Sequence, residues 1–237
     1  MFGVHRSEWV YWETLSLAIG KLGVTALAVH TVPTQVITVS FMLPLGLGIA
    51  LAIRLGSSLP VSVPHAKHLV LATLIVGTLI FSVLSWFLYH YRTSIFRIFT
   101  DDPDVMMGCE RIWWQVCVYY SQLSIYALNM GIATGLGMQW TLGAITFCFL
   151  WVLGLPAAWY IGVYRMASLE VTWSFIYPPY IFMNCILLVA FVCKDWDAVQ
   201  RDILARETEE LDGEMDTEVL VLKAEHDYGS LQNYKKH

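Results

Sequence analysis

Two glutamates in an aromatic, otherwise apolar stretch near the N-terminus are the residues best suited to chemistry. Glu8 and Glu13 lie in the segment SEWVYWETLSLAIG, with Trp9 and Trp12 between them. A carboxylate at the centre of a bilayer costs roughly 2.5–3.5 kcal/mol on insertion scales, so such a group usually faces a polar cavity. Beside tryptophan, the carboxylate can bind an organic cation through charge pairing and cation–π contact, and it can also exchange a proton.

The positions of the two acids along the chain favour Glu13. Glu13 lies deeper in the apolar run, whereas Glu8 is nearer its start, where a solvated carboxylate at the interface needs no special role. On a helix the two acids are about 140° apart around the axis, so they need not share a face. We therefore predict Glu13 as the first ion- or substrate-binding residue, with Glu8 beside it.

The next apolar segment adds two polar residues, His30 and Gln35. A lone histidine on an apolar helix is more often hydrogen-bonded to a neighbour than functional. Gln35 is a second-tier candidate, together with Trp9 and Trp12. The sequence holds no P-loop, nucleophile elbow or spaced metal-ligand set, so neither an enzyme nor a metal or cofactor site is predicted.

The composition requires that membrane-spanning helices position these residues. The chain has 237 residues, of which 57% are hydrophobic and 14% charged, against about 25% charged in soluble domains. Residues 1–192 hold 8 Lys and Arg with 7 Asp and Glu, whereas residues 193–237 hold 6 and 12. We predict a membrane domain over 1–192 and a solvated acidic segment over 193–237. A soluble enzyme is excluded, and so is a nucleic-acid-binding protein, because no basic face exists.

Six apolar stretches are long enough to cross a lipid bilayer, which takes about 20 helical residues. The predicted spans are 2–19, 26–55, 68–89, 113–131, 142–163 and 171–192. Pro33 and Pro44 predict a kink or break in the second. Asp101 or Asp102 is predicted to cap a helix that begins at Pro103. An even number of spans puts both termini on one side of the membrane, but the loop charges do not show which side.

The segment after the last span, KDWDAVQRDILARETEEL, predicts an amphipathic helix. Trp196, Val199, Ile203 and Leu204 fall at helical spacing, so the helix is expected to lie along the membrane or to pack on the bundle. The residues that follow are acidic and rich in turn formers, and they are predicted to be mostly disordered.

Several segments, in order along the chain, resemble the C-terminal half of the multidrug and toxic compound extrusion (MATE) transporters. EWVYWETLSLAIGKLG is similar to the seventh span of that family, with its E-W-x-x-x-E pattern, and FMLPLGLGIALAIRLGSSL to the eighth. GIATGLGMQWTLGA is similar to the turn before the eleventh span, VLGLPAAWYIGV to that span, and DWDAVQRDILARE to the segment after the twelfth. These matches cover about residues 8–206.

The resemblance implies an all-α, polytopic membrane protein that forms one six-helix lobe of a two-lobe transporter. It implies antiport of an organic cation or another xenobiotic, driven by a proton or sodium gradient, with both termini in the cytosol. The pair of acids in the family's seventh span corresponds to Glu8 and Glu13. Gln35 stands where animal members often carry a further acid, which leaves the substrate range and the coupling ion open.

One lobe supplies half of a central cavity, so a second lobe is the expected partner. It is either a second copy of this chain, a separate polypeptide or an N-terminal half that this sequence lacks. The alternative function is a non-transporting membrane subunit that regulates or scaffolds a full-length transporter. The two functions differ over Glu13, because a transporter needs that acid to be ionisable and a scaffold does not.

Overall fold

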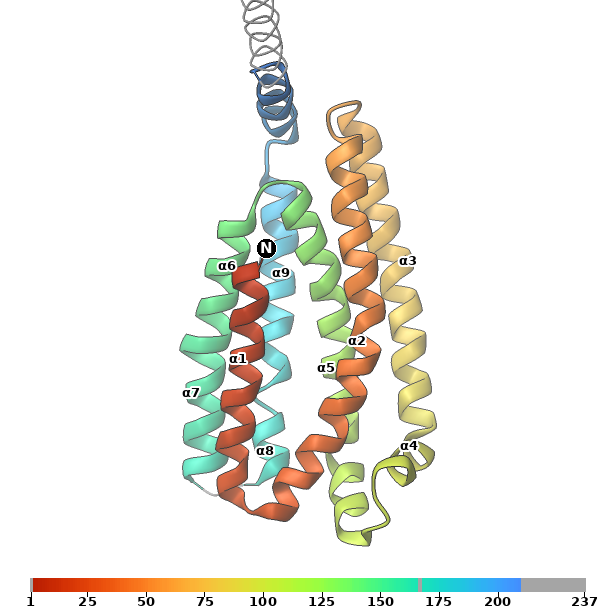
Figure 1. Cartoon of the computed structure of the whole chain (residues 1–237), viewed down its shortest axis with the longest axis vertical. Coiled ribbons are helices and arrows are strands. Elements are labelled where there is room, and N and C mark those ends of the chain that lie inside the picture. The colour runs from red at the N-terminus through yellow and green to blue at the C-terminus, as the bar shows by residue number, and fades with distance from the viewer. Residues whose placement is uncertain (1, 166–167, 210–237) are drawn as a thin grey trace, which may run out of the picture.

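The computed structural model describes residues 2–165 and 168–209, and these parts of the chain form an all-helical bundle without strands (Figure 1). Its long helices are α1 (Phe2–Ile19), α2 (Val24–Ser58), α3 (Val63–His90) and α5 (Pro103–Gly135). A further long segment comprises α6 (Gln139–Thr146), η2 (Phe147–Gly154), α7 (Leu155–Ala157) and η3 (Ala158–Tyr164), with π-helical turns in η2 and η3. The last consists of α8 (Leu169–Trp173) and α9 (Tyr177–Cys193). The all-α prediction is confirmed.

Four helical segments of the described chain are long and apolar enough to cross a membrane: Val24–Ser58, Val63–His90, Gln139–Tyr164 and Leu169–Cys193. The predicted first and fourth spans are also long helices, α1 and α5. Length and composition do not mark them as spans, because α1 contains Glu8 and Glu13 and α5 contains three amides. Those amides are Gln115, Gln122 and Asn129.

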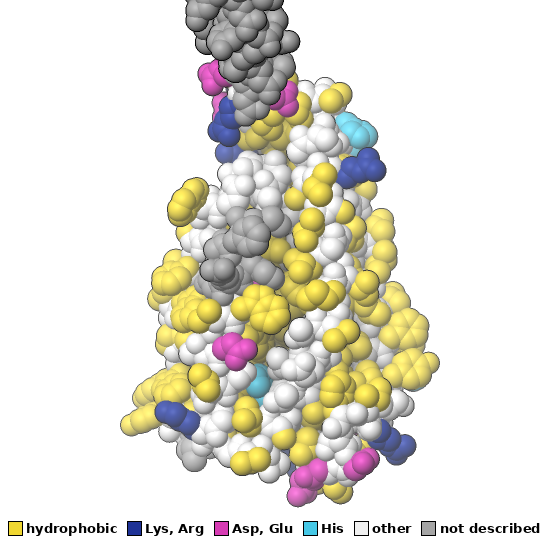
Figure 2. Space-filling view, in the orientation of Figure 1, with side chains coloured by type: hydrophobic (Ala, Val, Ile, Leu, Met, Phe, Trp, Pro, Cys, Tyr) yellow, Lys and Arg dark blue, Asp and Glu magenta, His cyan; other side chains and the backbone are white. Residues whose placement is uncertain are grey.

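The surface of the bundle is apolar between two charged ends. Figure 2 shows hydrophobic side chains over the middle of the body, while most charged groups gather near its two ends and an acidic side chain lies midway. Large apolar residues on α3, such as Leu79, Ile80 and Val83, are more than half exposed. Lipid tails rather than water suit such a surface, as in a multi-pass membrane protein.

Helices α2 and α5 form the most extensive contact between elements of the described chain. Gly48 and Gly131 make this crossing possible. A Cβ atom on Gly48 would overlap the carbonyl oxygen of Ala127, and one on Gly131 would overlap the carbonyl oxygen of Gly48. Small residues at such a crossing let two backbones approach closely, which favours helix association in lipid.

The two prolines bend α2 without breaking it. Pro33 and Pro44 both lie inside one continuous helix, which changes direction in its N-terminal third (Figure 1). A proline has no N–H to donate to the carbonyl four residues earlier. In hydrocarbon no water replaces that donor, so another part of the protein must supply it.

Helix α5 supplies both missing donors. The Cys109 thiol donates to the carbonyl oxygen of Val29, four residues before the first proline, at a sulfur–oxygen distance of 3.7 Å. The Tyr120 hydroxyl donates to the carbonyl oxygen of Ser40, four residues before the second, at 3.3 Å. Two prolines inside α2 are therefore tolerated in lipid because α5 lies against this helix and supplies the missing donors.

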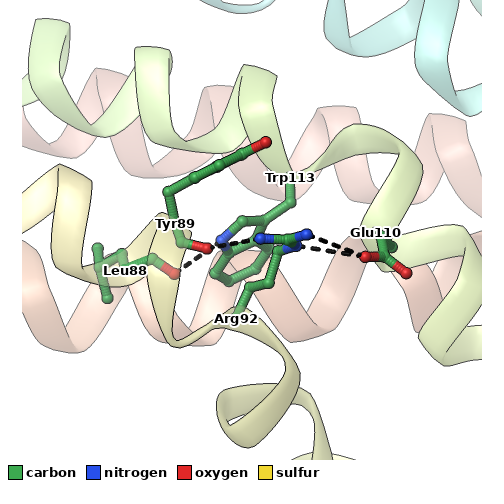
Figure 3. A network of polar contacts seen from close by, with 5 residues as sticks. All are labelled: Leu88, Tyr89, Arg92, Glu110 and Trp113. Atoms are coloured by element: carbon green, nitrogen blue, oxygen red, sulfur yellow. Dashed lines mark hydrogen bonds and ion pairs between the residues drawn. The ribbon is translucent and has the colours of Figure 1, made fainter.

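Helix α4 (Arg92–Phe99) is fixed to α3 and α5 by polar contacts (Figure 3). Arg92 pairs with Glu110 of α5 at 3.2 Å and donates to the carbonyl oxygen of Tyr89 at 3.1 Å. The indole N–H of Trp113 donates to the carbonyl oxygen of Leu88 at 3.0 Å. These contacts join α3, α4 and α5 at one end of the bundle.

The predicted start of α5 is confirmed. Pro103 is its first residue, and the Asp102 carboxylate accepts a hydrogen bond from the N–H of Asp104 at 2.9 Å. A carboxylate in this position satisfies a backbone donor of the first turn and interacts favourably with the positive end of the helix.

The predicted amphipathic helix is present at residues 196–209 and packs on the end of the bundle at its start. Trp196 is buried, and Gln200 donates to the carbonyl oxygen of Pro60 between α2 and α3 at 2.8 Å. The N–H of Ala198 donates to the Asp195 carboxylate and lowers the pKa of that group. The predicted disordered tail, residues 212–237, lies outside the described residues.

Replacing Gly48 with alanine should lower the stability of the protein, because the new methyl group meets the backbone of α5. Such overpacking typically costs about 1–3 kcal/mol. Gly46→Ala is the matched control, since a Cβ atom there meets no atom within 4 Å. Thermal unfolding in detergent should show a lower Tm for Gly48→Ala alone. Equal Tm values for the two variants would contradict the close crossing.

Tyr120→Phe should destabilise the protein because it leaves the Ser40 carbonyl oxygen without a donor. An unsatisfied buried acceptor costs about 1–3 kcal/mol. In a Pro44→Ala background the restored backbone N–H can bond that carbonyl, so Tyr120→Phe should then cost little. The free energies of unfolding of the four proteins test this coupling, and an equal cost of Tyr120→Phe in both backgrounds would refute it.

Candidate functional site

A cavity of about 250 Å³ lies between α1, α2 and α5. We call it the Glu8 cavity. The candidates from sequence all line it: Glu8, Trp9, Trp12, Glu13 and Gln35. The other lining residues are Ser16, Thr34, Ile37, Thr38, Phe41, Tyr119 and Leu123. The site therefore combines carboxylates, hydroxyls and aromatic faces.

Glu8 is the buried acid of this cavity. Its residue is only 5% exposed, and the Tyr180 hydroxyl of α9 donates to its Oε1 atom at 2.7 Å. The Tyr180 ring packs edge-on against Tyr119 and Tyr126 of α5, with centroid distances of 5.0 and 5.5 Å. The carboxyl group thus reaches the interior of the bundle, where three helices enclose it.

Glu13 is the exposed acid of the cavity, whereas Glu8 is buried. Depth along an apolar run does not determine which face of a helix packs inward. Position 8 of α1 faces the tyrosines of α5 and α9, whereas position 13 lies on the open side of the cavity. Although the two acids are separated around the helix, both reach the same cavity. Their roles stay predictions.

Trp12 forms an aromatic wall beside the acids. Its indole is stacked on His30 at a centroid distance of 6.2 Å and an interplanar angle of 19°. It also contacts Tyr119 at 5.2 Å and Trp173 at 6.4 Å. His30 is buried, and its Nε2 atom lies 3.3 Å from the Ser16 hydroxyl, which confirms the prediction of a histidine bonded to a neighbour.

Trp9 and Gln35 occupy the open side of the cavity. Trp9 is 45% exposed, and Gln35 is exposed on the wall formed by α2. Gln35 places an uncharged amide in that wall. Both residues therefore stay second-tier candidates for contact with a bound molecule.

Sequence reasoning missed a stripe of amides on α5. Gln115, Gln122 and Asn129 are seven residues apart, a spacing that places them on one face of a helix. Asn129 donates to the side-chain oxygen of Asn184 at 3.0 Å, and Asn184 donates to the backbone and side-chain oxygens of Gln122 at 2.9 and 3.2 Å. This spacing is the signal that could have revealed the polar contact between α5 and α9.

Tyr180 was also missed, because nothing in the segment YPPYIFMN distinguishes it from an interfacial tyrosine. Its function as a donor to Glu8 depends on helices far apart in the chain. The site can bind a cation by charge and by aromatic contact. No group of three His, Cys, Asp or Glu side chains within the described residues could hold a metal ion.

Comparison with known families matches residues 4–160, more than half of the chain, to the MatE family. The chain belongs to the MatE family. Its fold is similar to that of the eukaryotic MATE transporter AtDTX14, with a TM-score of 0.76 at 18% sequence identity. That similarity covers 84% of this MatE chain and 45% of the other. The predicted MATE-type membrane fold is thus confirmed.

Curated relatives of this MatE chain include bacterial multidrug resistance proteins. It is 29% identical over 156 residues to MdtK of Proteus mirabilis (strain HI4320), covering 65% of this chain and 34% of the relative. It is 27% identical over 157 residues to MdtK of Yersinia pseudotuberculosis serotype O:1b (strain IP 31758), covering 66% and 34%. The aligned region is about a third of the length of these relatives.

Cysteine labelling should reproduce the order of burial of the two acids. In a background without the exposed Cys148, Cys185 and Cys193, Glu13→Cys should react quickly with a charged thiosulfonate reagent. Glu8→Cys should react at least about tenfold more slowly, because access limits the reaction. Labelling rates in liposomes measure this. A faster reaction at position 8 than at position 13 would contradict the packing of α1.

Proposed function

We propose that the chain is one lobe of a secondary active transporter that exchanges an organic cation or another xenobiotic for a proton or a sodium ion. Membership of the MatE family and the similarity to multidrug resistance proteins support this proposal. The observation that carries it is the buried Glu8 carboxyl group, bonded to Tyr180, on the wall of an aromatic cavity. The lobe needs no cofactor other than the coupling ion.

The exchange follows from the electrostatics of Glu8. A carboxylate in a low-dielectric interior is unfavourable unless a positive partner or several hydrogen bonds compensate its charge. Tyr180 donates one hydrogen bond to one of the two oxygens. A coupling ion or a cationic substrate can supply the remaining compensation, and either one removes the attraction for the other.

The rest of the cavity suits a flat organic cation. Trp12 and Tyr119 present aromatic rings to the cavity, and an aromatic face attracts a cation within about 6 Å. Glu13 and Trp9 lie on the open side, where they would meet the molecule first. Glu13 would attract the cation, and Glu8 would hold it until the coupling ion arrives.

A second lobe would cover the open side of this cavity. The site residues Trp9, Glu13 and Gln35 are exposed on it, although binding would require them to be shielded from lipid. The second lobe is a second copy, a separate polypeptide or an N-terminal half. In this arrangement the lobe spans a cellular membrane with both termini in the cytosol.

Glu8→Gln should reduce gradient-driven efflux of an organic cation to near background, because glutamine keeps the shape of the side chain but cannot change its charge. Glu8→Asp should retain part of the activity, and Glu13→Gln should mainly raise KM. Transport in proteoliposomes of the assembled complex measures these effects. Glu110→Gln is the control, since that carboxylate pairs with Arg92 at the exposed end of the bundle.

Wild-type transport in Glu8→Gln and in Glu13→Gln would contradict the proposal. Both acids would then be structural, and a subunit that scaffolds a full-length transporter would be the better account. Equal expression and membrane insertion of all variants must be verified first.

A further inference from the structure

A second cavity lies in line with the Glu8 cavity along α2 and α5. It measures about 480 Å³ and is formed where α2, α5 and α8 begin. We call it the end cavity. Its lining includes Val29 of α2, Ile112 of α5 and Glu170 of α8. The Glu8 cavity begins further along the same helices, at Thr34 and Tyr119, so a layer of side chains separates the two.

This layer contains buried polar atoms without partners. His30 Nδ1, Trp173 Nε1 and Gln115 Oε1 make no hydrogen bond within the described chain. The three residues are at most 3% exposed, and the rings of His30 and Trp173 are 5.7 Å apart between centroids. A buried polar atom without a partner is costly, so several of them in one layer indicate a bound polar molecule.

The layer is connected to both cavities by hydrogen bonds. The Gln115 amide nitrogen donates to the backbone oxygen of Glu170, which lines the end cavity, at 3.1 Å. His30 Nε2 lies 3.3 Å from the hydroxyl of Ser16, which lines the Glu8 cavity. Each cavity therefore has a lining residue that is hydrogen-bonded to one polar residue of this layer.

The chemistry of the three atoms identifies the molecule. The Ser16 hydroxyl donates to the carbonyl oxygen of Trp12 at 2.9 Å, so it accepts from His30 Nε2–H and leaves Nδ1 as an acceptor. Gln115 Oε1 is a second acceptor, and Trp173 Nε1–H is a donor. A cation would be repelled by the donor and an anion by the acceptors. A water molecule can accept a hydrogen bond from the donor and donate one to each acceptor, and buried waters typically make about three hydrogen bonds.

We propose that water molecules bound by His30, Trp173 and Gln115 join the two cavities and deliver protons to Glu8. The delivery of protons to Glu8 rests on the proposed function. A proton leaves solvent at the end cavity, and each transfer breaks one O–H bond as the next forms. The last transfer places the proton on the Glu8 carboxylate as the organic cation leaves. The path opens at the end of the bundle opposite the C-terminus of α9 (Figure 1).

Oxidative footprinting tests the water site. Hydroxyl radicals generated within the protein in nanodiscs oxidise side chains that contact bound water. Trp173 and Trp113 are both fully buried, but the indole N–H of Trp113 is bonded to the Leu88 carbonyl. Trp173 should therefore be oxidised several-fold faster than Trp113. Equal protection of the two tryptophans would overturn the proposal.

Replacing His30 tests the proton path. His30→Phe should reduce the oxidation of Trp173 and slow proton uptake by Glu8 after a pH jump several-fold, without changing its final extent. The carboxyl infrared band that Glu8→Gln removes reports this uptake. His30→Asn should recover part of the rate, and His90→Phe, on the exposed end of α3, should have no effect. An unchanged rate in His30→Phe would overturn the path.

The two proposals fail in different ways. If Glu8→Gln transports normally, the antiport mechanism is wrong, while the oxidation of Trp173 still decides whether water occupies the layer. If Trp173 is protected although Glu8→Gln abolishes transport, protons reach Glu8 by another route and only the water site is refuted.

Discussion

Every backbone polar group in a membrane must find its partner within the protein, and the contact between α2 and α5 shows the consequence. Pro33 and Pro44 leave two carbonyl groups of α2 without their usual donors. Cys109 and Tyr120 of α5 supply these donors, and Gly48 lets the two backbones approach. Helix α5 is thus held against α2 by these two hydrogen bonds as well as by packing.

The same requirement governs the candidate site. Once α5 lies against α2, its next face carries tyrosines and amides toward α1 and α9. A buried carboxyl at Glu8 is tolerated because Tyr180 donates to it. His30 Nδ1 and Trp173 Nε1, which lack partners within the described chain, belong to residues between two cavities. Several buried polar groups of this lobe therefore lie along the proposed path of the ion.

The helices and the candidate residues that line the Glu8 cavity could be predicted from the sequence, but the contacts of these residues could not. Apolar length predicts helices, and the Asp102–Pro103 pair predicts a helix start. The burial of Glu8 and the exposure of Glu13 could not be predicted, because burial depends on which face of α1 meets other helices. Tyr180 lies 172 residues from Glu8, so their contact has no local signal. Composition does not mark α5 as a membrane span, because this long helix contains three amides. The partners of these amides lie on other helices, so their contacts also have no local signal.

The central claim is that one carboxyl group, Glu8, is occupied in turn by a proton and by an organic cation. Calorimetric titration of the assembled protein with tetraphenylphosphonium, in buffers of different ionisation enthalpy, counts the protons released on binding. The account predicts about one proton released per cation bound at a pH where Glu8 is protonated, and none from Glu8→Gln. Cation binding without proton release in the native protein, or the same release from Glu8→Gln, would contradict it.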